Sequence, residues 1–236
     1  MQQTLTLPNG HTIPYQLEHR PRRTVGLKIT QQGLVVHAPK RIVVQQLNQI
    51  LLEKSHWILN KLAQREANQV HPIAWQTGEQ LLYLGQDLTL EVHQNPKNKA
   101  LLHEAGRLVV ATSAPDNAML IARKVVQWYQ KQALQDFARR LQLLSAKLGV
   151  PTPTLMLSNA RTRWGSCNSR GEVRLSWRLL QAPPHIINYV ICHELAHLKE
   201  MNHSAKFYAV VAQLFPEYKQ AEKELKQLSP QLHRMG

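Results

Sequence analysis

The chain has 236 residues, of which 43% are hydrophobic and 19% are charged, and this composition excludes a fibrous or an intrinsically disordered protein. Its 29 lysines and arginines against 15 aspartates and glutamates give a formal net charge of +14. Such an excess attracts polyanions, but it serves equally well as a solvated surface, so it excludes neither a polyanion-binding protein nor an ordinary enzyme.

The N-terminus and the hydropathy of the chain predict a cytoplasmic protein. Residues 1–8 lack the basic segment and long apolar run of a secretory signal peptide. No apolar stretch approaches the roughly 18 residues that cross a bilayer, so no membrane association is expected. The two cysteines, Cys167 and Cys192, are too few for a disulfide framework and are expected to be free thiols in a reducing compartment.

Residues 1–115 are predicted to form a β-rich N-terminal region with one helix. Apolar residues recur at threes and fours from Val43 to about Asn68, which indicates an amphipathic helix. Short β-prone runs separated by Gly, Asn and Pro turn signals predict the strands around it, at 4–7, 25–30, 34–37, 81–84, 88–92 and 108–111.

Residues 116–236 are predicted to form a second domain, which starts after the Ala114-Pro115-Asp116 segment. Asp116 could cap a long helix from about 117 to 148, which Gly149 would end. Strands at 154–158 and 172–177 are expected to bracket turns at Gly165 and Gly171, and Pro183-Pro184 opens a further helix at a position where proline fits. The predicted fold class is therefore α+β, and no internal repeat is found.

The segment His193-Glu194-Leu195-Ala196-His197 carries the pattern of a metal site. Four residues advance an α-helix by about one turn, so His193 and His197 lie about 40° apart on one face and both can reach a single ion. Glu194 lies one step further round the helix. Its carboxylate is therefore placed to activate a water on the ion as a base rather than to bind the ion itself.

His203 is the predicted third ligand, because two histidines alone would hold an ion weakly. If the helix continued, His203 would face away from His197, so the helix must end between Leu198 and Asn202. Asn202 tolerates the left-handed conformation that often ends helices, and Ser204 is then a suitable cap for the next helix. The competing interpretation, two surface histidines on an ordinary helix, explains neither the apolar flank nor the third histidine.

Several motifs taken together resemble one known family. Arg163-Trp164-Gly165-Ser166-Cys167, Tyr189-Val190, the 193–197 segment and Asn202-His203-Ser204 resemble the YgjP-like metallopeptidase family, whose site is similar to those of SprT-like and other small zincin families. The resemblance covers most of the chain. It implies a zincin-like catalytic domain with one zinc ion on the three histidines and with Glu194 as the catalytic acid and base.

The leading hypothesis is that the chain is a zinc-dependent metallopeptidase that acts on peptides or unfolded proteins. The strand at 172–177 could lie along the edge of the cleft and bind an extended peptide by strand addition. The candidates to bind substrate or to stabilise an oxyanion are Arg163, Arg174 and Tyr208.

Two alternatives stay open. Arginines that precede the metal helix also suit phosphate oxygens, so the rival enzyme is a metal-dependent nucleoside triphosphate pyrophosphohydrolase, with UTP as one possible substrate. The positive charge also permits a nucleic-acid-associated protein with a structural metal. Against that class, structural zinc sites usually have four protein ligands, and only three histidines are evident here.

Overall fold

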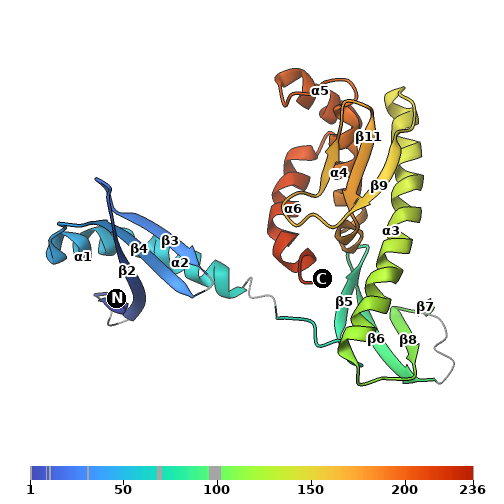
Figure 1. The fold of residues 1–236 in the computed structure, drawn as a ribbon. Coiled ribbons are helices and arrows are strands. Elements are labelled where there is room, and N and C mark those ends of the chain that lie inside the picture. The colour runs from blue at the N-terminus through green and yellow to red at the C-terminus, as the bar shows by residue number, and fades with distance from the viewer. Residues whose placement is uncertain are drawn as a thin grey trace. The chain divides into compact units, whose positions relative to one another are not determined.

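The computed structural model divides the chain into two compact units, Met1–Gln69 and Val70–Gly236, each with its own hydrophobic core (Figure 1). It describes residues 2–8, 10, 12–30, 32–67, 71–95 and 102–235. Strands and helices are both abundant, which confirms the predicted α+β class. Within the described ranges, no helix combines the length and the apolar character that a membrane span requires.

The first unit is a four-stranded sheet followed by two helices. The sheet has the order β1-β2-β4-β3, in which β2 and β4 are parallel and the other two pairs are antiparallel. The helix predicted from Val43 is divided in two at Lys54, although the hydrogen bond from Lys54 N to Ile50 O continues the helical pattern through the bend. The expected end of that helix, Asn68, lies outside the described residues. The elements are β1 (Gln2–Thr6), β2 (Thr12–Arg20), β3 (Gly26–Thr30), β4 (Gly33–Pro39), α1 (Val44–Glu53) and α2 (Ser55–Ala67).

The second unit begins with a sheet of the same topology. Its order is β5-β6-β8-β7, again with a parallel central pair and antiparallel outer pairs. Gly33 and Gly106, which both have positive φ, open β4 and precede β8, respectively. This repeat of topology was not predicted, because it lies in the order and direction of strand pairing rather than in a repeated series of residues. The elements are β5 (Gln80–Tyr83), β6 (Gln86–Gln94), β7 (Leu102–Glu104) and β8 (Arg107–Thr112).

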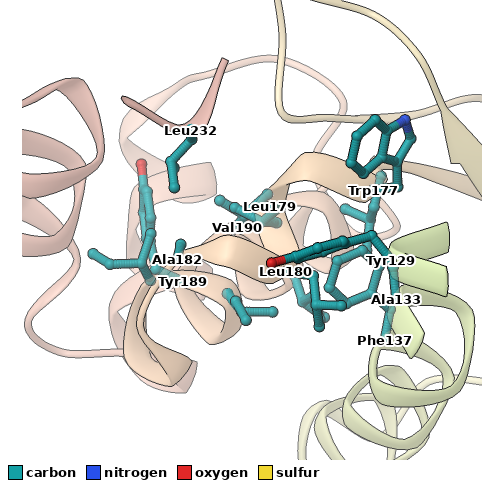
Figure 2. Packing of buried hydrophobic residues seen from close by; sticks show 14 of the residues in the cluster. Tyr129, Ala133, Phe137, Trp177, Leu179, Leu180, Ala182, Tyr189, Val190 and Leu232 are labelled. Carbon is teal, nitrogen blue, oxygen red and sulfur yellow. The ribbon is translucent and has the colours of Figure 1, made fainter. Parts of the chain in front are cut away.

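The long predicted helix is present as α3 (Ala118–Leu148), and it forms the spine of the second unit (Figure 1). Its cap is Asn117 and not Asp116, because the Asn117 side chain accepts a hydrogen bond from Leu120 N at 3.0 Å. Gly149 ends the helix with φ 72°, as predicted. Tyr129 and Phe137 project from α3 into the core, where the ring centroids of Tyr129 and Trp177 are 6.4 Å apart (Figure 2).

The remaining elements of the second unit are a small sheet and the helices that follow it. A three-stranded sheet of order β10-β11-β9 is followed by a 3-10 helix and three α-helices. Gly165 lies within a strand rather than in the expected turn, and α6 was not predicted. The elements are β9 (Thr154–Ser158), β10 (Gly165–Cys167), β11 (Glu172–Ser176), η1 (Trp177–Gln181), α4 (Pro184–Ala196), α5 (Ala205–Leu214) and α6 (Tyr218–Leu232).

The boundary predicted after residue 115 lies inside the second unit, which begins at Val70. Within this unit, the β5–β6 hairpin contacts the segment that leads into α4. Leu84 N and Gly85 N donate to the carbonyls of Leu180 and Gln181 in η1, at 2.9 and 3.0 Å. Gly85 has φ 79°, and a Cβ on it would lie 2.9 Å from Cα of Pro183, the residue that precedes α4. A residue with a side chain would therefore disturb both the turn and the start of the helix.

Arg140 joins α3 to α4, and its removal is expected to be strongly destabilising. Its guanidinium donates to Asp136 Oδ2 at 2.5 Å, to Asn188 Oδ1 at 2.7 Å and to the Pro184 carbonyl at 3.3 Å. Arg140→Ala leaves the largely buried Asp136 carboxylate without this partner, and we expect a loss of about 3 kcal/mol in the free energy of unfolding, measured with urea. Arg139→Ala is the matched control, because Arg139 also pairs with Asp136 but is exposed, and it should cost less than about 1 kcal/mol. Equal losses in the two variants would contradict the prediction.

Candidate metal centre

Helix α4 begins where the sequence predicts. Pro183 precedes it, and Pro184 occupies its first turn, where the missing N–H needs no partner. The apolar face is fully buried and fixes the rotation of the helix; it consists of Ile186, Ile187, Val190, Ile191 and Leu195. His193 and Glu194 therefore lie in the last turn, and His197 is the C-cap.

The chain reverses after His197, as the third-ligand hypothesis requires. The turn is made by hydrogen bonds from Leu198 N to Leu195 O at 3.0 Å and from Glu200 N to Ala196 O at 2.9 Å. The helix thus ends at Ala196, slightly before the expected interval. The prediction that Asn202 adopts a left-handed conformation is wrong. The described non-glycine residues with positive φ are Trp75, Leu84 and Ala105. The reversal is made by tightened turns of the helix end instead.

The reversal brings three imidazoles together. One nitrogen from each of His193, His197 and His203 lies within 4.8 Å of the others, and the Nε2 atoms of His193 and His203 are 3.0 Å apart. Nitrogens that bind one zinc ion tetrahedrally at about 2.0–2.1 Å lie about 3.4 Å from each other, so the three side chains fit such an ion. His197 Nδ1 lies 3.3 Å from the Glu200 carbonyl, and a proton donated there leaves Nε2 free to bind.

Phe207 forms an apolar wall against the three imidazoles. Its ring is fully buried, and its centroid lies 4.9, 4.6 and 4.6 Å from those of His193, His197 and His203. Ser204 caps α5 through a hydrogen bond from Phe207 N to its Oγ at 3.4 Å, as predicted. The position of Phe207 beside the histidines is visible only in three dimensions.

Burial keeps the imidazoles in the form that binds metal. It lowers the pKa of His193 to about 4, and the neighbouring His197 and His203 add to this effect. Burial also lowers the pKa of His197, against the opposing effect of its contact with the Glu200 carbonyl. Both rings are therefore neutral at pH 7 and have a lone pair available for an ion.

Glu194, which follows His193 in α4, is 5% exposed. Burial raises the pKa of its carboxyl to about 8, and the positive charge of Arg163 acts in the opposite direction. β10 runs directly against this side chain, since a Cβ on Gly165 would lie 2.7 Å from Cδ of Glu194. A side chain at this position would require the strand or the Glu194 carboxylate to move, and the sequence offers no local signal for this contact.

The other candidate residues lie at different distances from this centre. Arg163 is exposed and close enough to Glu194 for its charge to act on the carboxyl. Tyr208 is 36% exposed, and its ring centroid lies 6.3 Å from that of His203. Arg174 is exposed between the buried Val173 and Leu175, so it points to the opposite face of the sheet from the core. The structure therefore brings Arg163 and Tyr208, but not Arg174, to the centre.

The strand that borders the centre is β10 and not the strand predicted at 172–177. β11 (Glu172–Ser176) lies in the middle of its sheet, between β10 and β9. β10 pairs with β11 on one side, and in the described part of the chain no strand pairs with its other side. A strand in this position can accept a further strand along its outer side.

Gly165→Ala is expected to lower any hydrolysis that uses the Glu194 carboxylate by about 100-fold, because the added methyl must displace either the strand or that carboxylate by about 1 Å. Metal affinity should stay close to that of the wild type, since no imidazole is touched. Ser166→Ala, one residue further along the same strand, is the matched control and should keep most of the activity. Steady-state kinetics and zinc titration of both variants test the prediction, which fails if the two behave alike.

The raised pKa of Glu194 predicts a pH dependence of stability in the metal-free protein. Folding raises this pKa from 4.5 to about 8. The protonated carboxyl therefore contributes fully to the free energy of unfolding below pH 4.5, and this contribution is lost as the pH rises to about 8. Glu194→Gln cannot ionise, and we expect the metal-free variant to become more stable than the wild type over this window, by roughly 3 kcal/mol near neutral pH. Urea unfolding at about pH 5 and pH 8 measures it, and identical pH dependences would refute it.

A comparison with protein families finds a match over most of the chain. The family model described as "YgjP-like, metallopeptidase domain" matches residues 23–228. Among curated proteins, the UTP pyrophosphatase of Escherichia coli (strain K12) is 29% identical over 86 residues, which are 36% of this chain and 48% of that protein. The chain thus spans about half the length of this relative.

Two solved structures resemble part of the chain. They are the metallopeptidase zymogens of Pyrococcus abyssi abylysin, at 24% identity, and of Methanocaldococcus jannaschii jannalysin, at 19%. Each match covers 39% of this chain and 94% of the other, with a TM-score of 0.36.

Proposed function

Because the chain belongs to the YgjP-like metallopeptidase family, we propose that it is a zinc-dependent metallopeptidase that cleaves peptides or unfolded proteins. The family makes it a metal-dependent hydrolase; the choice of zinc and of a peptide substrate is our proposal. Two free thiols, Cys167 and Cys192, suit a reducing compartment, and we propose the cytoplasm as its location.

Each residue of the centre has a separate role in the proposed reaction. His193, His197 and His203 would hold the ion, which when bound supplies Lewis acidity and lowers the pKa of water. The Glu194 carboxylate takes a proton from the attacking water and returns it to the leaving amine. A cation on the triad favours the ionised form of Glu194, so metal binding prepares the carboxylate to act as a base. Phe207 and the apolar face of α4 keep bulk water from the buried side of the imidazoles.

The observation that supports a peptide substrate is the open edge of β10 beside Glu194. An extended peptide that adds to this edge forms main-chain hydrogen bonds with the strand, which recognise any peptide backbone. Because Gly165 touches Glu194, a peptide bond aligned there would lie close to the carboxylate. Arg163 and Tyr208 border the same region and are our candidates for binding the substrate or stabilising developing negative charge.

A second candidate function is the hydrolysis of nucleoside triphosphates. It is favoured by the partial similarity to a UTP pyrophosphatase and by the exposed Arg163 next to Glu194, since a guanidinium matches phosphate oxygens. The same three histidines and carboxylate could direct water to phosphorus instead of carbon. A nucleic-acid-associated protein with a structural metal remains a third class, supported by the net charge of +14.

A hydrolysis assay, together with a nucleic-acid binding measurement at increasing salt, separates the three functions. The zinc-loaded protein and its Glu194→Gln variant are incubated with unfolded protein, with a peptide mixture and with UTP and other nucleoside triphosphates; zinc is then replaced by magnesium or manganese. Peptide cleavage that needs Glu194 supports the proposal. Pyrophosphate release without peptide cleavage decides for the nucleotide enzyme. Salt-sensitive nucleic-acid binding without either hydrolysis decides for the third class.

A further inference from the structure

The segment that leads into β10 is held by the C-terminal end of the chain. Trp164, the residue before β10, stacks on His233 with ring centroids 4.3 Å apart and an interplanar angle of 15°. Its Nε1 donates to Ser229 Oγ at 3.1 Å. Both partners lie beyond the part of the chain that the family model matches, residues 23–228.

Two arginines tie the same segments together through the backbone. Arg161 donates to the His233 carbonyl at 3.1 Å. Arg178, which is buried at 5% exposure, donates to the Met235 carbonyl at 2.7 Å and to the Asn159 carbonyl at 3.3 Å. The C-terminal clamp, defined as Ser229, His233 and Met235, therefore contacts the chain from Asn159 to Trp164 both directly and through η1.

The next residue of the chain is the one that touches the catalytic carboxylate. Gly165 follows Trp164, and its backbone leaves no room for a side chain beside Glu194. The Trp164 carbonyl is fixed as well, because it accepts a hydrogen bond from Ser176 N at 2.8 Å. Trp164 is therefore held by the C-terminal clamp through its ring and by β11 through its carbonyl, one residue before the glycine that contacts the carboxylate.

We propose that the C-terminal clamp positions β10 against Glu194, and that His233 and Trp164 are positioning residues for the reaction. The predicted effect on turnover rests on the proposed function, whereas the predicted effect on the position of β10 does not. The flat face of His233 carries the contact, since its Nδ1 is buried and has no hydrogen-bond partner among the described residues. Phenylalanine should therefore replace this histidine, whereas alanine should not.

The experiment compares His233→Ala, His233→Phe and the control His185→Ala. His185 is exposed and pairs with Glu224 at 2.9 Å, a contact that joins α4 to α6. Amide hydrogen exchange over residues 159–167 is measured in the full-length protein, with and without zinc. Zinc affinity, kcat and KM are measured in parallel.

We expect His233→Ala to increase exchange over 159–167 by about 10-fold and to lower kcat by about 5- to 10-fold, with zinc affinity unchanged. His233→Phe should restore both, and His185→Ala should alter neither. If His233→Ala does not fold, Ser229→Ala removes the hydrogen bond to Trp164 and is judged by the same measurements. Unchanged exchange in the clamp variant, or an equal change in the control, overturns the proposal. If the wild type cleaves no substrate, the proposed function fails, while the exchange data still decide on the clamp.

Discussion

Replacing Glu194 with glutamine is expected to lower turnover by about 10²- to 10⁴-fold while the metal stays bound. The amide has nearly the shape of the carboxyl and fills the same buried space against Gly165, but it cannot accept the proton of the attacking water. Because the three imidazoles are untouched, the variant should still bind zinc.

The measurement is kcat on whichever substrate the wild type hydrolyses, together with the zinc content of both proteins. Glu200→Gln is the matched control, because Glu200 lies near the same centre but meets His197 through its backbone carbonyl rather than its side chain. That variant should retain most of the activity. Full activity in Glu194→Gln would remove the carboxylate from the mechanism.

His203→Ala is expected to weaken zinc binding by on the order of 10³-fold, because one of three ligands is lost. This side chain is exposed, so its removal should cost little stability in the metal-free protein. The loss therefore reports on the metal and not on the fold. It also tests the chain reversal after His197 directly, since His203 reaches the centre only through that turn.

Competition with a chromophoric chelator gives the zinc affinity, and the zinc-induced rise in melting temperature gives an independent value. His185→Ala is again the control, because it removes a histidine from the same region outside the triad. If His203→Ala binds zinc as tightly as the control does, the third ligand must be sought elsewhere.

The parts of the site that could be predicted are those set by local geometry. The rotation of α4 follows from the spacing of its apolar residues, and the need for a turn before His203 follows from helix geometry alone. The type of turn did not follow, because Asn202 offers a left-handed conformation that the tightened helix end makes unnecessary.

Contacts between distant segments could not be predicted. Gly165 meets Glu194 across 29 positions of sequence, and nothing near Gly165 distinguishes a glycine that a carboxylate requires from one that a turn requires. The edge position of β10 depends on which strands pair, and three residues are too short a pattern to reveal it. Helix α6 was missed although Ala221, Leu225 and Leu232 are buried at helical spacing, since Pro230 within that segment argues against a helix.

The two separate hydrophobic cores have a consequence for calorimetry. A chain with two cores need not unfold in a single step. Its heat-capacity trace can contain two peaks, and a single melting temperature then describes neither unit. All three histidines belong to Val70–Gly236, so saturating zinc should move the peak of that unit and leave the other in place. The peak that moves would then identify the unfolding transition of the unit that contains the three histidines.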